Sequence, residues 1–216
     1  MQHPFIIDHS GDGKIPLVKE GNLNINEYLL IIQPHEDLYN KVMSLKKSFA
    51  EKYDCPLAMY TKSHITLVNF VQWEMREQSL LQRMKNLIEC SNPFQVSIDG
   101  FGSLPSHTIY MNIQTKSNIT ELVKSLRPIQ SLMTLSKDHK PHFILEPHLT
   151  IARKLKPWQY EKAWLDYSHL NFTANFGVNK AILLRRQVDT KKYFQIASFP
   201  LMNKPSDSHT QASLFS

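Results

Sequence analysis

Apolar residues follow two periods along the chain, and the two patterns alternate. Short apolar runs bounded by turn residues predict strands at residues 27–33, 63–71, 94–101, 108–113, 147–153, 171–178, 181–186 and 193–199. Apolar positions three or four residues apart predict helices at residues 36–52, 78–90, 118–132 and 158–167. The mixture of the two kinds of element predicts an α+β fold.

The two halves of the chain repeat one order of elements: a strand, a helix and then a pair of strands. This weak duplication predicts two pseudo-symmetric lobes, each an antiparallel-rich sheet with flanking helices, around a central cleft. We expect residues 1–25 to form a flexible N-terminal arm, residues 26–202 a single bilobal domain, and residues 203–216 a disordered polar tail.

Composition narrows the choice of partner and compartment. Of the 216 residues, 42% are hydrophobic and 20% charged, as in an ordinary globular protein, and the net charge of +6 favours a polyanionic partner such as RNA. The two cysteines, Cys55 and Cys90, lack the spacing of metal ligands and favour a reducing compartment. Neither a signal peptide nor an 18-residue apolar stretch is evident, so we expect a cytoplasmic monomer without membrane contact.

One tetrapeptide pattern occurs twice inside predicted strands. His64-Ile65-Thr66-Leu67 is followed 84 positions later by His148-Leu149-Thr150-Ile151. In a strand, residues i and i+2 share a face, so each copy sets an imidazole beside a hydroxyl and turns its aliphatic residues to the other face. A single copy would more often be structural, whereas two copies in apolar runs indicate a function.

Two imidazoles and two hydroxyls in one groove would suffice to split a phosphodiester. Histidine serves as general acid or base near neutral pH because its ordinary pKa is about 6.5. The threonine hydroxyls can hold the phosphate oxygens, so this chemistry needs neither a metal nor another cofactor.

The chain resembles the two-histidine phosphoesterase superfamily, and within it the RNA 2′,3′-cyclic phosphodiesterase or 2′-5′ RNA ligase-like proteins. The resemblance covers residues 27–202 and rests on the first motif, on Pro147-His148-Leu149-Thr150-Ile151-Ala152-Arg153, and less specifically on Tyr193-Phe194-Gln195-Ile196 with Phe199-Pro200-Leu201. It implies a LigT-like fold with a positively charged cleft.

The resemblance also implies roles for individual residues. His64 would be the acid and His148 the base, Thr66 and Thr150 would bind phosphate oxygens, and Arg153 would stabilise the charge on phosphorus. Tyr193 and Phe70 are candidate substrate contacts. The family often places a phenylalanine five residues after the first histidine, where this chain has Asn69. Phe70 is therefore equally compatible with a place in the core.

The resemblance implies a hydrolase in RNA processing that opens 2′,3′-cyclic phosphate ends of RNA or small cyclic nucleotides. The reverse reaction would join a 2′,5′ linkage. Three alternatives stay open: a phosphodiesterase for 2′,5′-oligonucleotides, a non-catalytic protein on the same fold that binds RNA or nucleotides, and a metal-dependent hydrolase using His139, His142 and His148.

Overall fold

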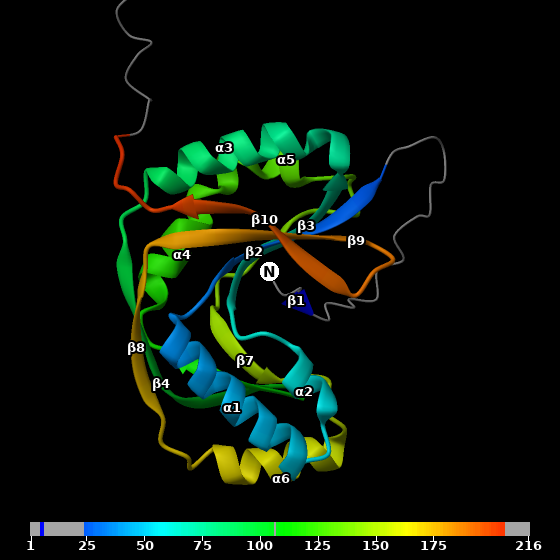
Figure 1. The fold of residues 1–216 in the computed structure, drawn as a ribbon, viewed down its shortest axis with the longest axis vertical. Helices are drawn as coiled ribbons and strands as arrows, with labels where there is room; N and C mark the ends of the chain where they lie inside the picture. Colours follow the sequence, from blue (N-terminus) through cyan, green and yellow to red (C-terminus); the bar gives the residue numbers. More distant parts are fainter. Residues whose placement is uncertain (1–4, 7–23, 106, 206–216) are drawn as a thin grey trace, which may run out of the picture.

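The computed structural model describes residues 5–6, 24–105 and 107–205 (Figure 1). Its strands are β1 (Phe5–Ile6), β2 (Ile25–Ile32), β3 (Ile65–Trp73), β4 (Phe94–Leu104), β5 (Thr108–Ile113), β6 (His142–Phe143), β7 (His148–Ala152), β8 (Thr173–Val178), β9 (Lys180–Gln187) and β10 (Lys192–Pro200). Its helices are α1 (Glu36–Lys52), α2 (Pro56–Tyr60), α3 (Glu77–Glu89), α4 (Lys116–Ser125), α5 (Gln130–Met133) and α6 (Pro157–Tyr167), with short 3₁₀ turns at Glu74–Arg76 and Arg127–Ile129.

The strands form two antiparallel groups that meet at the two motif strands. The order is β1-β10-β9-β2-β3-β7-β5-β4-β8, and β6 pairs with β3 off this path. At the centre, β3 and β7 share a single register pair, Ile65 with Leu149. The strands on either side of this junction diverge, so the ribbon has the shape of a C (Figure 1). The predicted α+β fold with two lobes is confirmed.

The lobes do not correspond to the two halves of the sequence. The β9–β10 hairpin of the second half joins β2 and β3, whereas the β4–β5 hairpin of the first half joins β7 and β8. Of the two motif strands, β7 lies between β3 and β5 of the first half, and β3 lies between β2 of its own half and β7 of the second. This interleaving ties the lobes together, because neither sheet can form from one half alone.

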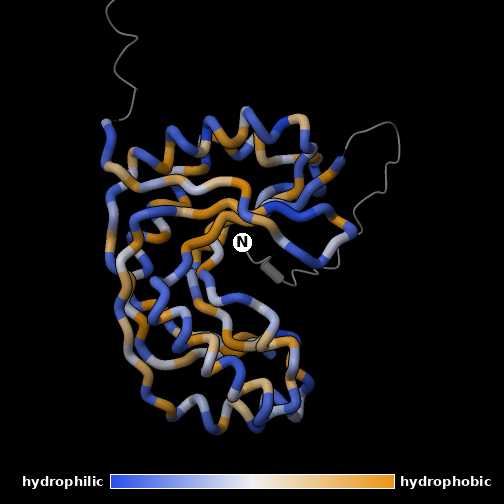
Figure 2. The backbone as a smooth tube through the Cα atoms, in the orientation of Figure 1, coloured by the Kyte–Doolittle hydropathy of each residue, from blue (hydrophilic) through white to orange (hydrophobic). Residues whose placement is uncertain are grey.

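Helices cover the outer face of each lobe. In Figure 1, α3, α4 and α5 lie over the lobe of β2, β3, β9 and β10, whereas α1, α2 and α6 lie over the lobe of β4, β5, β7 and β8. Figure 2 shows the apolar positions concentrated on the strands, while the helices alternate between polar and apolar positions. One continuous core joins both lobes and includes Tyr28, Val42, Met84 and Leu149.

Each predicted strand and helix has a counterpart in the structure, but one helix is broken, and β1, α2 and β6 were not predicted. The helix expected over 118–132 ends at Ser125 and continues as a 3₁₀ turn and the short α5. Pro128 explains the break, because proline lacks the amide hydrogen that an α-helix needs and its ring clashes with the preceding turn.

The ends of the chain differ in part from the expected arms. Phe5 and Ile6 form β1, which pairs with β10, and Ile25 already belongs to β2. The amides of Asn203 and Lys204 donate to the carbonyls of Ser91 and Glu89. The rest of the expected arm and tail lies outside the described residues. No helix in the described part of the chain is long and apolar enough to cross a membrane.

Candidate active site

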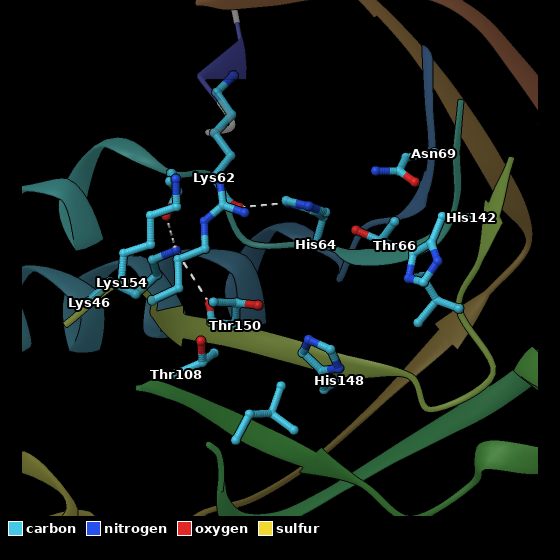
Figure 3. A pocket seen from close by; sticks show the side chains of 14 residues that line it. Lys46, Lys62, His64, Thr66, Asn69, Thr108, His142, His148, Thr150 and Lys154 are labelled. Carbon is cyan, nitrogen blue, oxygen red and sulfur yellow. Dashed lines mark hydrogen bonds between the residues drawn. The ribbon is translucent and has the colours of Figure 1, made fainter. Parts of the chain in front are cut away.

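Both motifs line one cavity of about 330 Å³ at the junction of the lobes (Figure 3). Its described lining residues are Lys46, Thr61, Lys62, His64, Thr66, Asn69, Leu104, Thr108, His142, Ile144, His148, Thr150, Arg153 and Lys154. A second cavity of about 360 Å³ adjoins it and shares His142 and His148. The two histidines, the two threonines and Arg153 singled out from the sequence are therefore brought together.

The two motif histidines are held in the same way. Nδ1 of His64 lies 2.8 Å from the carbonyl oxygen of Lys62, and Nδ1 of His148 lies 3.0 Å from that of Glu146. A carbonyl can only accept, so each Nδ1 carries the proton and donates it. In each ring Nε2 is then the unprotonated nitrogen, and the hydrogen bond to the carbonyl does not use it. The phenol ring of Tyr110 also packs on His148, with centroids 5.0 Å apart.

A β-bulge in β3 decides which side chains after Thr66 face the cavity. Ile31 pairs with Thr66, but Leu30 pairs with Val68, so Leu67 is an extra residue. The bulge shifts the alternation by one position. Thr66 and Asn69 consequently both line the cavity, and sequence reasoning that assumed strict alternation missed Asn69.

Lys46 on α1 lines the cavity and contacts the backbone of β7. Its side chain is almost fully buried, and Nζ donates to Thr61 Oγ1 at 2.7 Å and to the Thr150 carbonyl at 3.4 Å. Burial, together with the nearby charge of Arg153, lowers the pKa of Lys46 to about 7. The sequence held a signal for this residue, since Lys46 continues the apolar stripe of Leu38 and Val42 at a spacing of four.

The cavity favours neutral imidazoles when no ligand is bound. Burial lowers the pKa of His64 from 6.5 to about 4, and the charges of Lys46 and Arg153 act in the same direction. Burial also lowers the pKa of His148, and Lys116 adds to that effect. Lys116 is itself paired with Glu146 at 2.8 Å. The stronger positive field is therefore at His64.

A family model described as the 2′-5′ RNA ligase superfamily matches residues 34–190, which include both motifs and all the described residues that line the cavity. The chain belongs to this superfamily. No curated protein matches the sequence.

Several solved structures have a similar fold. E. coli LigT, solved with 3′-AMP, has a TM-score of 0.58 and 15% sequence identity, and the match covers 82% of this chain and 98% of that one. TT0787 of Thermus thermophilus has a TM-score of 0.56 and 16% identity over the same shares. At this identity the likeness establishes the LigT-like fold.

Two aromatic residues considered as substrate contacts lie outside the cavity of this 2′-5′ RNA ligase superfamily member. Phe70 is 3% exposed and stacks on Tyr28 in the core, with ring centroids 5.1 Å apart. Tyr193 is fully buried in a small apolar cluster, where the guanidinium of Arg186 lies over its ring. The bulge accounts for the place of Phe70, because it turns Asn69 rather than Phe70 to the cavity.

The three histidines of the metal alternative are not brought together. In the part of the chain that the structure describes, no three His, Cys, Asp or Glu side chains form a group that could hold a metal ion. His142 lines the cavity beside His148, but Nδ1 of His139 lies 2.8 Å from the hydroxyl of Ser136. Sequence reasoning placed His142 in a loop; in the structure it pairs with Asn69 as part of β6.

Proposed function

We propose that this protein is a phosphodiesterase that opens 2′,3′-cyclic phosphate ends of RNA or nucleotides by acid–base catalysis with His64 and His148, without a metal. The observation that carries the proposal is the paired arrangement of the two imidazoles. Each has its Nδ1 bonded to a carbonyl two residues earlier in the chain, and both line one cavity with Thr66 and Thr150.

The reaction assigns one proton transfer to each imidazole. Water attacks phosphorus and loses a proton to the neutral imidazole, while the bond from phosphorus to one ribose oxygen breaks and that oxygen takes a proton from the imidazolium. The product is a phosphomonoester. Thr66 and Thr150 donate to the non-bridging oxygens, and Arg153 offsets the charge that develops on them.

The charges around the two rings favour His64 as the base and His148 as the acid, the reverse of the order that the family resemblance implies. His64 lies beside Lys46 and Arg153, which disfavour an imidazolium there. His148 lies beside Lys116, whose charge is partly offset by Glu146. A proton is therefore more readily held on His148.

Superfamily membership is also compatible with two related reactions. The same site could run in reverse and join a 2′,5′ linkage, or could cleave 2′,5′-oligonucleotides, because both substrates present a phosphodiester to the same two imidazoles. Binding without turnover is the non-catalytic alternative. Intact histidines and threonines in both motifs support catalysis over binding alone.

The test is turnover of nucleoside 2′,3′-cyclic phosphates and of a 2′,5′-linked trinucleotide in EDTA. Wild type is compared with His64→Ala, His148→Ala and a control, His169→Ala, whose side chain is exposed and does not line the cavity. We expect cyclic phosphate turnover to survive EDTA and to fall by roughly 10²–10⁴-fold in both cavity variants, the range for loss of a general acid or base.

Other outcomes assign other functions. Activity that is lost in EDTA and restored by a divalent ion would contradict the two-histidine mechanism and favour a metal-dependent hydrolase. Turnover of the 2′,5′-linked trinucleotide alone would identify the second substrate class. If wild type binds a cyclic nucleotide but converts none of the substrates, the protein is a binding protein on this fold.

A further inference from the structure

The adjoining cavity of about 360 Å³ lies on the His148 side of the cavity that holds the two motifs. His142 and His148 line both cavities, and Figure 3 shows them on the side of the first cavity away from Lys154. His64 lines only the first. Most of the lining of the adjoining cavity is apolar, as in small-molecule sites generally. A ligand held between the two histidines can therefore extend into it past His148.

A glycine makes room for one aromatic ring in the wall of the adjoining cavity. Gly102 on β4 is paired directly with Tyr110 on β5, and a Cβ at Gly102 would lie 2.6 Å from Cζ of the tyrosine. Glycine inside a strand often marks such a close approach, and any other residue here would displace the ring. On its other side the ring packs on His148. Tyr110 is nevertheless only partly buried, so a ligand in the cavity can still reach it.

Tyr110 and Asn112 extend the face of the sheet that carries the second motif. In the pairing of β5 with β7, Tyr110 lies opposite Thr150 and Asn112 lies opposite His148. Residues directly opposite one another in neighbouring strands share a face. Asn112 is held in place, because its Nδ2 donates to the Phe101 carbonyl at 2.9 Å. A fixed aromatic ring with an amide beside it suits a flat ligand that has polar edges, as a nucleobase does.

The order of acid and base determines on which side of phosphorus the ribose lies. In an in-line displacement the attacking and departing oxygens are on opposite sides of phosphorus. With His64 as base and His148 as acid, water enters beside His64 and the ribose oxygen departs toward His148. The nucleoside stays bonded to phosphorus through its other ribose oxygen. It therefore lies on the His148 side, where the adjoining cavity begins.

We propose that the adjoining cavity is the subsite for the nucleobase of the reacting nucleotide, and that the base stacks on Tyr110. The subsite rests on the proposed function, with His148 as the acid. It provides the aromatic contact that Phe70 and Tyr193, which lie outside the motif cavity, do not. Every base has a face that can stack on an aromatic ring. The subsite therefore selects nucleotides over other cyclic phosphates without selecting one base sequence.

The first experiment compares adenosine 2′,3′-cyclic phosphate with methyl β-ribofuranoside 2′,3′-cyclic phosphate, which has a methoxy group in place of the base. Stacking of one base on an aromatic side chain corresponds to roughly 5- to 150-fold, so kcat/KM of wild type should be about tenfold or more higher for the nucleotide. Tyr110→Leu removes the ring and should abolish most of this preference, whereas Tyr110→Phe keeps the ring and should retain it. Tyr60→Leu is the matched control, because Tyr60 is 54% exposed on α2 and lines neither cavity.

The ratio of kcat/KM between the two substrates separates base stacking from a role of Tyr110 in holding His148. If the ring acted only by packing on His148, Tyr110→Leu would lower kcat/KM for both substrates by the same factor. An unchanged ratio in that variant therefore overturns the subsite. Gly102→Ala is a second variant, because its Cβ displaces the ring without removing it. It should lower the same ratio.

A binding measurement separates failure of the subsite from failure of the proposed function. Isothermal calorimetry compares adenosine 2′-phosphate with methyl β-ribofuranoside 2′-phosphate on wild type and Tyr110→Leu, and it requires no turnover. Tighter binding of the nucleotide to wild type, lost in the variant, supports the subsite even if no cyclic phosphate is hydrolysed. Equal affinity of wild type for the two ligands, or equal kcat/KM for the two substrates, overturns it while leaving hydrolysis to be judged on its own.

Discussion

Ile65 and Leu149 are paired directly across the junction of the two lobes, at the centre of the two motifs. Both side chains are fully buried in the core that the lobes share. In an antiparallel pair, one step along each strand sets His64 against Thr150 and Thr66 against His148. The two aliphatic residues therefore set the register of the four cavity side chains, and each histidine lies opposite the threonine of the other motif.

This relationship predicts that the junction limits both stability and activity. Leu149→Ala removes a fully buried side chain and should lower the free energy of unfolding by about 2–5 kcal/mol. Urea unfolding followed by circular dichroism measures the change. The variant should also lose kcat, because β3 and β7 have no second register pair in the described chain to hold them. A cost within about 0.5 kcal/mol, typical of surface positions, would contradict a central role for the pair.

The dependence of kcat/KM on pH should be a bell whose two limbs both lie below the ordinary histidine pKa of 6.5. In the free protein the pKa of His64 is about 4 and that of His148 is lowered, in both cases mainly by burial. The rate rises as the base loses its proton and falls as the acid loses its own. A bound phosphate is an anion that favours both imidazolium forms, so the profile of kcat should lie at higher pH than that of kcat/KM.

Lys46 provides the control for this profile. Lys46→Met keeps the length of the side chain and removes its charge, so the pKa of His64 should rise. The low-pH limb of the profile, which the base sets, should then move to higher pH. Lys46→Arg keeps a charge at that position and should leave the limb closer to that of wild type. If the low-pH limb is the same in wild type and both variants, the charge of Lys46 does not affect the pKa of His64.

The order of acid and base is tested with a substrate that needs no acid. The profile alone does not assign the two groups, because both orders produce the same bell. A nucleoside 3′-(p-nitrophenyl phosphate) has a leaving group that departs without a proton. His148→Ala should therefore keep far more of the wild-type rate on this ester than on a cyclic phosphate, whereas His64→Ala should be impaired on both. The opposite pattern would restore the order that the family resemblance implies.

The part of the site that could be predicted from the sequence is the part fixed by strand period. His64 with Thr66, and His148 with Thr150, share a face because residues two apart in a strand do so. Interleaving of the two halves could not be predicted in this way. It depends on which hairpin packs beside which motif strand, and the local pattern of a hairpin does not specify its neighbour in the sheet.

Two features of single residues were also not predicted from the sequence. The bulge at Leu67 adds one residue to β3 opposite β2. The adjacent apolar residues Leu67 and Val68 interrupt the alternation there, but Phe70 and Val71 interrupt it again without a bulge, so the pattern alone does not locate the bulge. Lys46 occupies an apolar position of α1, and a buried lysine is the less common reading of any lysine on a helix. Pro128, in contrast, is a visible helix breaker, and its effect on the helix expected over 118–132 was predictable.

Asn69 and Phe70 give the most direct test of the bulge, because it assigns them opposite roles. Phe70→Ala removes a buried ring stacked on Tyr28 and should cost about 3–5 kcal/mol of stability, with little change in KM for the protein that remains folded. Asn69→Ala removes a partly exposed amide that lines the cavity and should lower kcat/KM by about tenfold, one hydrogen bond to a charged ligand, with little change in stability. Thermal unfolding and steady-state kinetics on both variants distinguish the two roles. If Phe70→Ala instead raised KM without loss of stability, the ring would stack on substrate and β3 would have to run without its bulge.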